Sequence, residues 1–324
     1  MLLRFLRSPR IPALLLSVSM WLGVSGATHA SDLCKPTVTD RPRIGLVLGG
    51  GGARGIAHIG VIRVLEELRI PIDYVAGTSM GSIVGGLYAT GMTSQEMEQT
   101  IRELNWSDIF ADNTVRAERP YRRKRDDDLA LFGPKFGVGA KSSLLPRGAI
   151  SGQKIQFFFQ TVTSERVQTK NFDELPVPFR AIAADIVTGK PVVIAQGDLA
   201  TAMRASMSIP GLFSPIDFEG HLLVDGGIVN NLPVNVAQGM GADVLIAVDV
   251  GTPLSTRSEL TDFVSITSQL TGIMVVNNTE HQESLLTPND VLIVPQLGSE
   301  ITSVDFGKLD QSIPLGYEAA SALR

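Results

Sequence analysis

Short apolar runs alternate with segments of helical periodicity in the first half of the chain. Residues 43–48 and 72–76 are apolar runs, the first of them ended by glycines, and both are predicted to be buried strands. Residues 56–68 and 82–88 follow them with apolar side chains at helical spacing. A strand–helix–strand–helix order with short turns predicts a parallel sheet covered by helices.

The second half continues the alternation of strands and helices. Its clearest buried strand is 243–250. Residues 105–150 are less regular, and no linker divides 43–324, so we expect one domain there. The other predicted elements are strands at 178–187, 191–195 and 291–295, a hairpin at 218–224, and helices at 155–162, 199–207, 260–277 and 315–323.

The first 30 residues have the pattern of a secretory signal peptide. Arg4, Arg7 and Arg10 precede an apolar segment at 11–24, and 28–30 supplies small residues at both positions that a signal peptidase reads. The apolar segment is short for a membrane span of about 20 residues, so we favour cleavage over a membrane anchor. Export is therefore predicted, to the periplasm, the cell surface or outer membrane, or the medium.

Residues 31–42 are polar and read as a mature leader, which leaves 43–324 as the folded domain. The single cysteine, Cys34, lies in this leader, so the chain has no internal disulfide. With 44% hydrophobic and 19% charged residues the composition is globular. The formal net charge of −5 argues against a nucleic-acid partner.

A glycine cluster at 49–55 links the first strand to the first helix. Backbone N–H groups at such a helix start are unpaired and favour an anion, either a phosphate or a transient oxyanion. Gly50, Gly52 and Gly55 also fit the dinucleotide-binding pattern G-x-G-x-x-G. That alternative needs an acidic residue at the end of the next strand, and Asp73 instead stands at its start, so a nucleotide-binding oxidoreductase is the weaker hypothesis.

Residues 77–81 match G-x-S-x-G directly between a predicted strand and a predicted helix, which is the setting of a nucleophile elbow. A helix-capping serine is the simpler interpretation of Ser79. Because neighbouring parallel strands end at one edge of the sheet, the serine and the glycine cluster should open on the same edge. The N–H groups of Gly50, Gly51 and Gly52 would then hold an oxyanion formed at Ser79.

A serine nucleophile needs a base, and none of the four histidines has an obvious place for this role. His29 leaves with the signal peptide, His58 lies in the helix after the glycines, His221 in a hairpin and His281 in a polar helix end. Asp225, followed by two glycines at a predicted strand end, is the alternative. An ordinary Asp-Gly turn is the competing interpretation of that segment.

These three motifs, in this order, resemble the patatin-like phospholipase family over roughly residues 43–250, and the segment 205–215 is similar as well. The resemblance implies a three-layer α/β/α fold with a mainly parallel central sheet, and a Ser–Asp dyad without a catalytic histidine. The implied site consists of Ser79 and Asp225 as catalytic residues, Gly50, Gly51, Gly52, Arg54, Gly55 and Met80 around the oxyanion, and Gly77, Gly81, Gly226 and Gly227 as elbow and turn glycines.

The expected function is therefore hydrolysis of a fatty-acyl ester, of the phospholipase A type, without a metal or cofactor. Broad carboxylesterase or lysophospholipase activity, and a catalytically silent lipid-binding domain, are the alternatives. The basic residues at 122–125 are candidate headgroup contacts or a solvated loop, and the phenylalanines at 157–159 line an acyl channel or pack in the core. We expect peripheral contact with a membrane surface. A homodimer, and a C-terminal outer-membrane barrel module absent from this chain, are compatible with the resemblance.

Overall fold

The structure is a computed structural model that describes residues 41–110, 121, 137–139, 142–144, 148 and 150–323. The predicted signal peptide, Cys34 and the charged segment at 122–128 lie outside the described residues.

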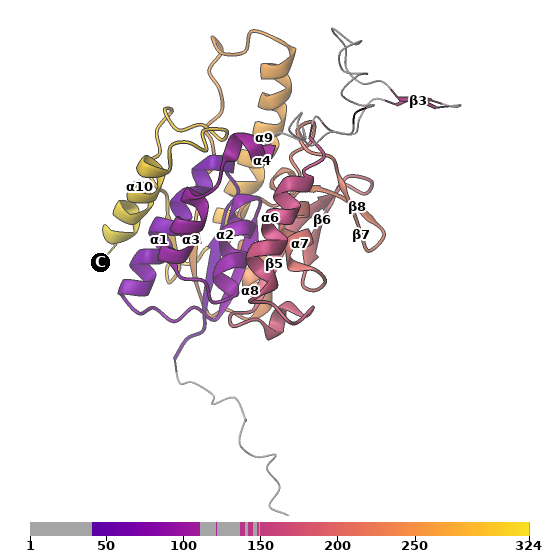
Figure 1. The fold of residues 1–324 in the computed structure, drawn as a ribbon. Helices are drawn as coiled ribbons and strands as arrows, with labels where there is room; N and C mark the ends of the chain where they lie inside the picture. Colours follow the sequence, from indigo (N-terminus) through magenta and orange to yellow (C-terminus); the bar gives the residue numbers. More distant parts are fainter. Residues whose placement is uncertain are drawn as a thin grey trace, which may run out of the picture. The chain divides into compact units, whose positions relative to one another are not determined.

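A mixed sheet forms the centre of the described chain, with the strand order β10-β9-β1-β2-β5-β8-β7 and with β6 paired to β5 (Figure 1). The strands from β10 to β5 pair in parallel, whereas β6 and β8 are antiparallel to β5, and β7 is antiparallel to β8. The bounds are β1 (Ile44–Leu48), β2 (Tyr74–Thr78), β5 (Phe179–Asp185), β6 (Lys190–Ile194), β7 (Ile216–Phe218), β8 (His221–Asp225), β9 (Val244–Val248) and β10 (Val291–Ile293). A separate antiparallel pair consists of β3 (Gly137–Gly139) and β4 (Ser142–Leu144).

Helices cover both faces of this sheet, and the alternation of side chains along β1 shows the two sides. Leu46 and Leu48 belong to one core cluster, and Val47 between them belongs to the other. The larger cluster packs under α1 (Ala57–Glu67), α2 (Met80–Ala89), α3 (Ser94–Arg102), α4 (Trp106–Phe110), α6 (Gln153–Ser164), α7 (Leu199–Ser206) and α10 (Leu309–Ser321). The smaller cluster packs under α8 (Val234–Met240), against which α9 (Phe263–Glu283) lies. The expected three-layer α/β/α arrangement is therefore confirmed.

Most predicted elements are found with shifted ends. β2 begins at Tyr74 and runs through the first two residues of the elbow motif, and α10 begins six residues before the predicted start at 315. The late prediction for α10 has a clear cause, because Pro314 lies inside the helix and proline normally marks a helix boundary. The helix after the glycine cluster opens with a turn of 3-10 helix, Gly52–Ile56.

Three α-helices, α3, α4 and α8, have no counterpart among the predictions. Helix α3 is polar, and Met97 and Ile101 are its only buried large apolar residues. The feature of the sequence that could have predicted α3 is the capping box at its start. Thr93 accepts a hydrogen bond from the N–H of Glu96, while the Glu96 carboxylate accepts one from the N–H of Thr93.

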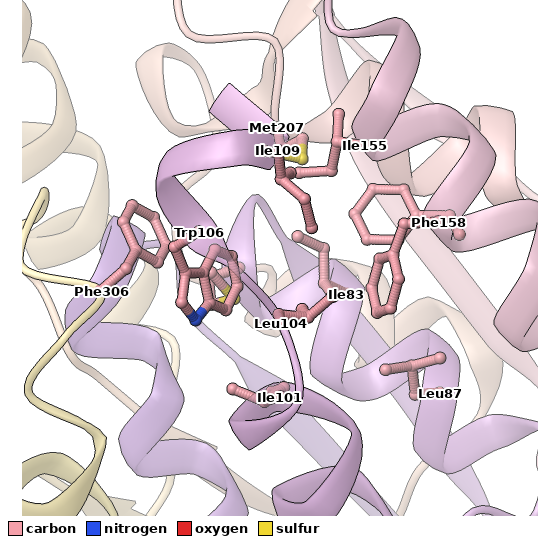
Figure 2. A pocket seen from close by; sticks show the side chains of 12 residues that line it. Ile83, Leu87, Ile101, Leu104, Trp106, Ile109, Ile155, Phe158, Met207 and Phe306 are labelled. Atoms are coloured by element: carbon pink, nitrogen blue, oxygen red, sulfur yellow. The ribbon is translucent and has the colours of Figure 1, made fainter. Parts of the chain in front are cut away.

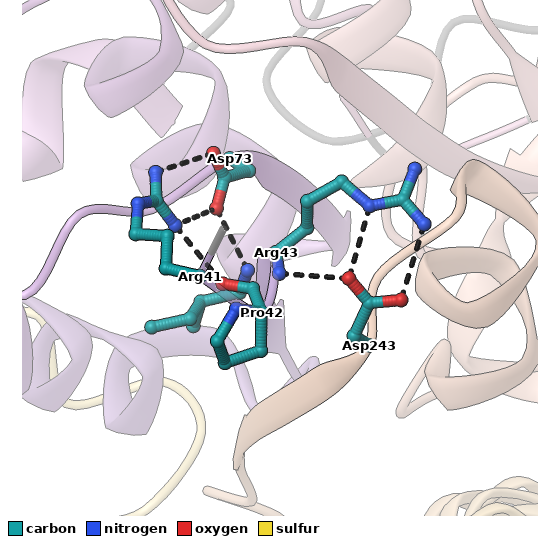
Figure 3. A network of polar contacts seen from close by, with 6 residues as sticks. Arg41, Pro42, Arg43, Asp73 and Asp243 are labelled. Carbon is teal, nitrogen blue, oxygen red and sulfur yellow. Dashed lines mark hydrogen bonds and ion pairs between the residues drawn. The ribbon is translucent and has the colours of Figure 1, made fainter. Parts of the chain in front are cut away.

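Ion pairs connect the N-terminal ends of β1, β2 and β9 (Figure 3). Arg41 donates two hydrogen bonds of 2.7 Å to Asp73, which also accepts from the N–H of Ile44, and Arg43 donates to Asp243. Asp73 therefore lies at the opposite end of the parallel strands from the glycine cluster. This position explains why it does not meet the dinucleotide pattern.

Candidate active site

Ser79 occupies a strained turn between β2 and α2. Its backbone has φ 53° and ψ −122°, a left-handed conformation that costs a non-glycine residue about 1–3 kcal/mol. The flanking glycines are required by close backbone packing. A Cβ on Gly77 would lie 2.3 Å from the carbonyl oxygen of Gly81, and a Cβ on Gly81 would lie 2.1 Å from that of Leu48. The elbow geometry predicted for 77–81 is thus present.

The last residue of α7 and the residues just after it hold this turn in place. The Ser206 hydroxyl accepts a hydrogen bond of 2.9 Å from the N–H of Ser79 and donates one of 2.5 Å to the carbonyl of Ile182. Two residues later, the carbonyl of Ser208 accepts a hydrogen bond of 2.9 Å from the N–H of Asp225. One short stretch therefore positions both proposed members of the dyad.

Sheet register brings Ser79 and Asp225 to the same level on either side of β5. Thr78 pairs with Ile182 on one edge of β5, and Asp225 pairs with the next residue, Ala183, on the other. The Ser79 hydroxyl donates a hydrogen bond of 2.6 Å to Oδ2 of Asp225. The two side chains, 146 residues apart in sequence, are in direct contact.

The Asp225 carboxylate is buried, with 7% of the residue exposed. Burial raises its pKa to about 6, although the hydrogen bonds from Ser79 and from the N–H of Gly227 favour the charged form. Gly227 donates to Oδ1 at 2.8 Å, so both carboxylate oxygens have donors. Gly226 must lack a side chain, because a Cβ there would lie 2.3 Å from the carbonyl oxygen of Ile182. A carboxylate with a pKa near neutrality suits a general base.

None of the histidines in the described part of the chain contacts Ser79 or Asp225. Nε2 of His58 lies 2.8 Å from the carbonyl oxygen of Gly49, and burial lowers the His58 pKa to about 4, so the ring is neutral behind the glycine loop. His221 lies 3.2 Å from Asp185 on the edge hairpin, and His281 lies near the end of α9. Over the described part of the chain, no cluster of three or more histidine, cysteine or acidic side chains could hold a metal ion.

The glycine loop offers fewer free donors than expected. The N–H of Gly50 donates to the carbonyl of Asn231 at 3.1 Å, so it is not available to an oxyanion. Within the described residues, the N–H groups of Gly51 and Gly52 make no hydrogen bond, and both glycines line a cavity with Ser79. The N–H of Met80, at the start of α2, is likewise without a backbone partner. The expected cradle of Gly50, Gly51 and Gly52 is therefore reduced to the last two glycines and Met80.

Two other residues expected around the oxyanion have packing roles. A Cβ on Gly55 would lie 2.5 Å from the Met80 side chain, so this glycine allows α2 to approach the loop. The buried Arg54 guanidinium donates to the carbonyls of Val250, Gly298 and Ile301 at 3.0, 2.8 and 2.7 Å. The expectation that Arg54 faces the oxyanion is wrong, since its Nε and Nη1 donate to these carbonyls and Arg54 does not line the cavity that contains Ser79.

Asn231 is a site residue to which sequence reasoning assigned no role. It accepts from the N–H of Gly50, and its side-chain amide donates to the carbonyl of the same glycine at 3.2 Å. Its own N–H donates to Asn278 on α9, which in turn donates to the carbonyl of Gly227 at 2.8 Å. Asn231 thus connects the glycine loop with the aspartate turn. The only signal in the sequence was a pair of asparagines shortly after Asp-Gly-Gly.

The glycine loop, the elbow and the aspartate turn all lie within a match to a known protein family. The family profile described as patatin-like phospholipase matches residues 46–237, which include the glycine loop, the elbow and the aspartate turn. The chain belongs to the patatin-like phospholipase family. It is 31% identical over 312 residues to human patatin-like phospholipase domain-containing protein 6, an alignment that covers 86% of this chain and 20% of that protein.

Two further proteins are similar to this chain. An uncharacterized NTE family protein of Mycobacterium tuberculosis is 35% identical over 209 residues, covering 64% of this chain and 49% of that protein. The crystal structure of VipD from Legionella pneumophila matches with a TM-score of 0.48 and 17% identity, over 87% of this chain and 67% of that one. This patatin-like chain spans about a fifth of the length of its mammalian relatives.

Proposed function

We propose that this family member is a serine lipid acyl hydrolase of the phospholipase A type, with Ser79 as nucleophile and Asp225 as its base. The observation that carries the proposal is the 2.6 Å hydrogen bond between the Ser79 hydroxyl and the buried Asp225 carboxylate. A strained serine and a carboxylate with a pKa raised to about 6 are the features that nucleophile and general-base roles require.

The reaction follows from these contacts. Oδ2 of Asp225 accepts the Ser79 hydroxyl proton as Oγ attacks the ester carbonyl, and the N–H groups of Gly51, Gly52 and Met80 stabilise the oxyanion. Collapse of the intermediate breaks the ester C–O bond, and the departing alcohol takes the proton from Asp225. A water molecule then gives a proton to Asp225 and attacks the acyl-enzyme. Release of the fatty acid returns that proton to Ser79.

Paired substitution tests the dyad. Ser79→Ala and Asp225→Asn should each lower ester hydrolysis by at least about a thousandfold, the order seen when a nucleophile or its base is removed. Ser164→Ala, at an exposed helix end, is the matched serine control. A fluorophosphonate probe should label the wild type and the control, but not Ser79→Ala. Full turnover by either dyad variant would refute the assignment, and phospholipids labelled at one acyl position would identify the bond cleaved.

A lipid substrate, with peripheral contact of the enzyme with a membrane, is supported by the exposed side of α9. Phe263 is 83% exposed, and Ile266, Leu270 and Met274 continue the same stripe at helical spacing. Residues 263–279 carry no charged side chain, and this helix also lines the cavity in front of Ser79. An exposed apolar stripe beside the cavity mouth favours a lipid surface as its partner.

No helix in the described ranges is long and apolar enough to cross a bilayer.

A further inference from the structure

Ser79 lies between two spaces of different chemistry. On one side is a cavity of about 410 Å³, whose lining includes polar residues such as Asn231, Gln269 and Thr302. On the other side is a cavity of about 50 Å³ lined almost wholly by apolar side chains, among them Ile83 and Phe213. The serine therefore stands at the boundary between a wide cavity with a mixed polar and apolar lining and a narrow cavity whose lining is almost wholly apolar.

A second apolar cavity, of about 20 Å³, continues from the narrow one. The two share four lining residues, Met80, Ile83, Met207 and Phe306, so they are adjacent. The second is lined only by apolar and aromatic side chains from several helices, and Figure 2 shows Met207 at one end of this group and Leu87 at the other. Together the cavities form an interrupted apolar path leading away from Ser79.

Helix α2 gives this path a direction and a length. Met80, Ile83 and Leu87 are spaced i, i+3 and i+7, so they share one face of the helix that begins at the elbow. At 1.5 Å per residue, Leu87 lies about 10 Å along the helix axis from Met80. Ile101 of α3 and Phe158 of α6 complete the lining near that far end (Figure 2).

The path is nearly closed in this structure. Methionine side chains, which can change conformation to fit a ligand, are among those that narrow it. A cavity needs about 10–15 Å³ to hold one water molecule, so neither small cavity holds an alkyl chain as it stands. Met80 and Met207 stand where the cavities join, and methionine side chains adjust readily to the shape of a ligand. Phe306 stacks on Trp106 with 4.5 Å between ring centroids and forms the remaining wall.

We propose that the two apolar cavities are the closed form of an acyl-chain channel, and that Ile83 and Leu87 set the length of chain accepted. The acyl part of the ester enters this channel, and the alcohol part occupies the wide cavity beside Asn231, which offers polar as well as apolar side chains. The inference rests on the proposed function. The channel adds the orientation of the substrate and two specificity-determining residues to that function.

Hydrolysis of acetate, octanoate and palmitate esters of one chromogenic alcohol, by the full chain, tests the channel. Ile83→Phe should lower the palmitate-to-acetate ratio of kcat/KM by about tenfold or more, the discrimination that one or two methylene groups bring in an apolar pocket. Leu87→Ala should raise the same ratio. Val84→Ala is the matched control on α2, because Val84 is buried but does not line either cavity, and it should leave the ratio unchanged.

The outcomes separate this inference from the proposed function. If the wild type hydrolyses esters but folded Ile83→Phe and Leu87→Ala keep its chain-length profile, the channel is refuted and the dyad is not. If the wild type hydrolyses none of the esters and Ser79 is not labelled by a fluorophosphonate, both proposals fall. Circular dichroism identifies folded variants, and Leu87→Val replaces Leu87→Ala should the latter fail to fold.

Discussion

Replacement of Asp225 by asparagine should abolish activity and at the same time stabilise the protein at neutral pH. The carboxylate is buried, and its burial raises the pKa from the ordinary 3.8 to about 6. Asparagine has the same shape and no charge. Its carbonyl oxygen keeps an acceptor for the N–H of Gly227, and its amide donates to the hydroxyl of Ser79.

The size and sign of the effect follow from the shift in pKa. A rise from 3.8 to about 6 means that the folded state holds the proton more tightly, and the ionised form costs about 3 kcal/mol of stability above pH 6. Below about pH 4 the carboxyl group is protonated in both states and this cost is absent. As pH rises through the interval from about 4 to 6, the wild type loses stability that Asp225→Asn retains. The advantage of the variant should therefore grow from near zero to about 3 kcal/mol.

Urea unfolding of both proteins across this pH range measures the difference directly. Asp185→Asn is the control with the opposite sign, because hydrogen bonds from the N–H of Val187 and from His221 lower the pKa of Asp185. That variant should lose stability at neutral pH and little at low pH. A stability difference for Asp225→Asn that is independent of pH, or a variant less stable than the wild type at pH 7, would refute the reasoning.

The same geometry makes four further predictions. The kcat/KM of ester hydrolysis should rise with pH to a plateau as Asp225 loses its proton at about pH 6, as a pH–rate profile would show. Ser206→Ala removes the acceptor for the N–H of Ser79 and should cost about 1–3 kcal/mol in urea unfolding, together with a fall in kcat. Asn231→Ala removes the side-chain hydrogen bond to the carbonyl of Gly50 that holds the glycine loop in place. Steady-state kinetics should show kcat lowered by about tenfold or more, with little change in KM. A double variant with Phe263→Ser and Leu270→Ser should reduce co-sedimentation with zwitterionic lipid vesicles, with circular dichroism as the control for folding.

Local signals in the sequence were sufficient for the strands of the central sheet and for the elbow, but not for the pair β3 and β4. The turn at Ser79 depends on glycines two residues to either side, and the strand before it and the helix after it are both visible in the pattern of apolar residues. The parallel pairing of β1 with β2 then follows from the right-handed strand–helix–strand connection. For this reason the position of the glycine loop beside the elbow could be predicted before any coordinates.

Contacts between distant segments could not be predicted in the same way. Arg54 finds its partners 196 to 247 residues further along the chain, and Asn231 meets Gly50 across 181 residues. Nothing near Arg54 in the sequence distinguishes a guanidinium that faces a substrate from one that ties the loop to the C-terminal segment. The position of Asp225 at a strand end made it a candidate base, and the family resemblance made it the expected partner of Ser79.

The arrangement around Ser79 concentrates three unfavourable features in one place. They are a serine with positive φ, a buried carboxylate, and loop N–H groups of Gly51 and Gly52 that have no partner among the described residues. The last two are lowered in energy when an ester carbonyl becomes an oxyanion, because a proton reaches Asp225 and the loop N–H groups gain an acceptor. The fixed surroundings, Ser206 above all, keep the site from relaxing before substrate arrives. Substitutions that relieve one of these features should therefore stabilise the fold and slow the reaction together.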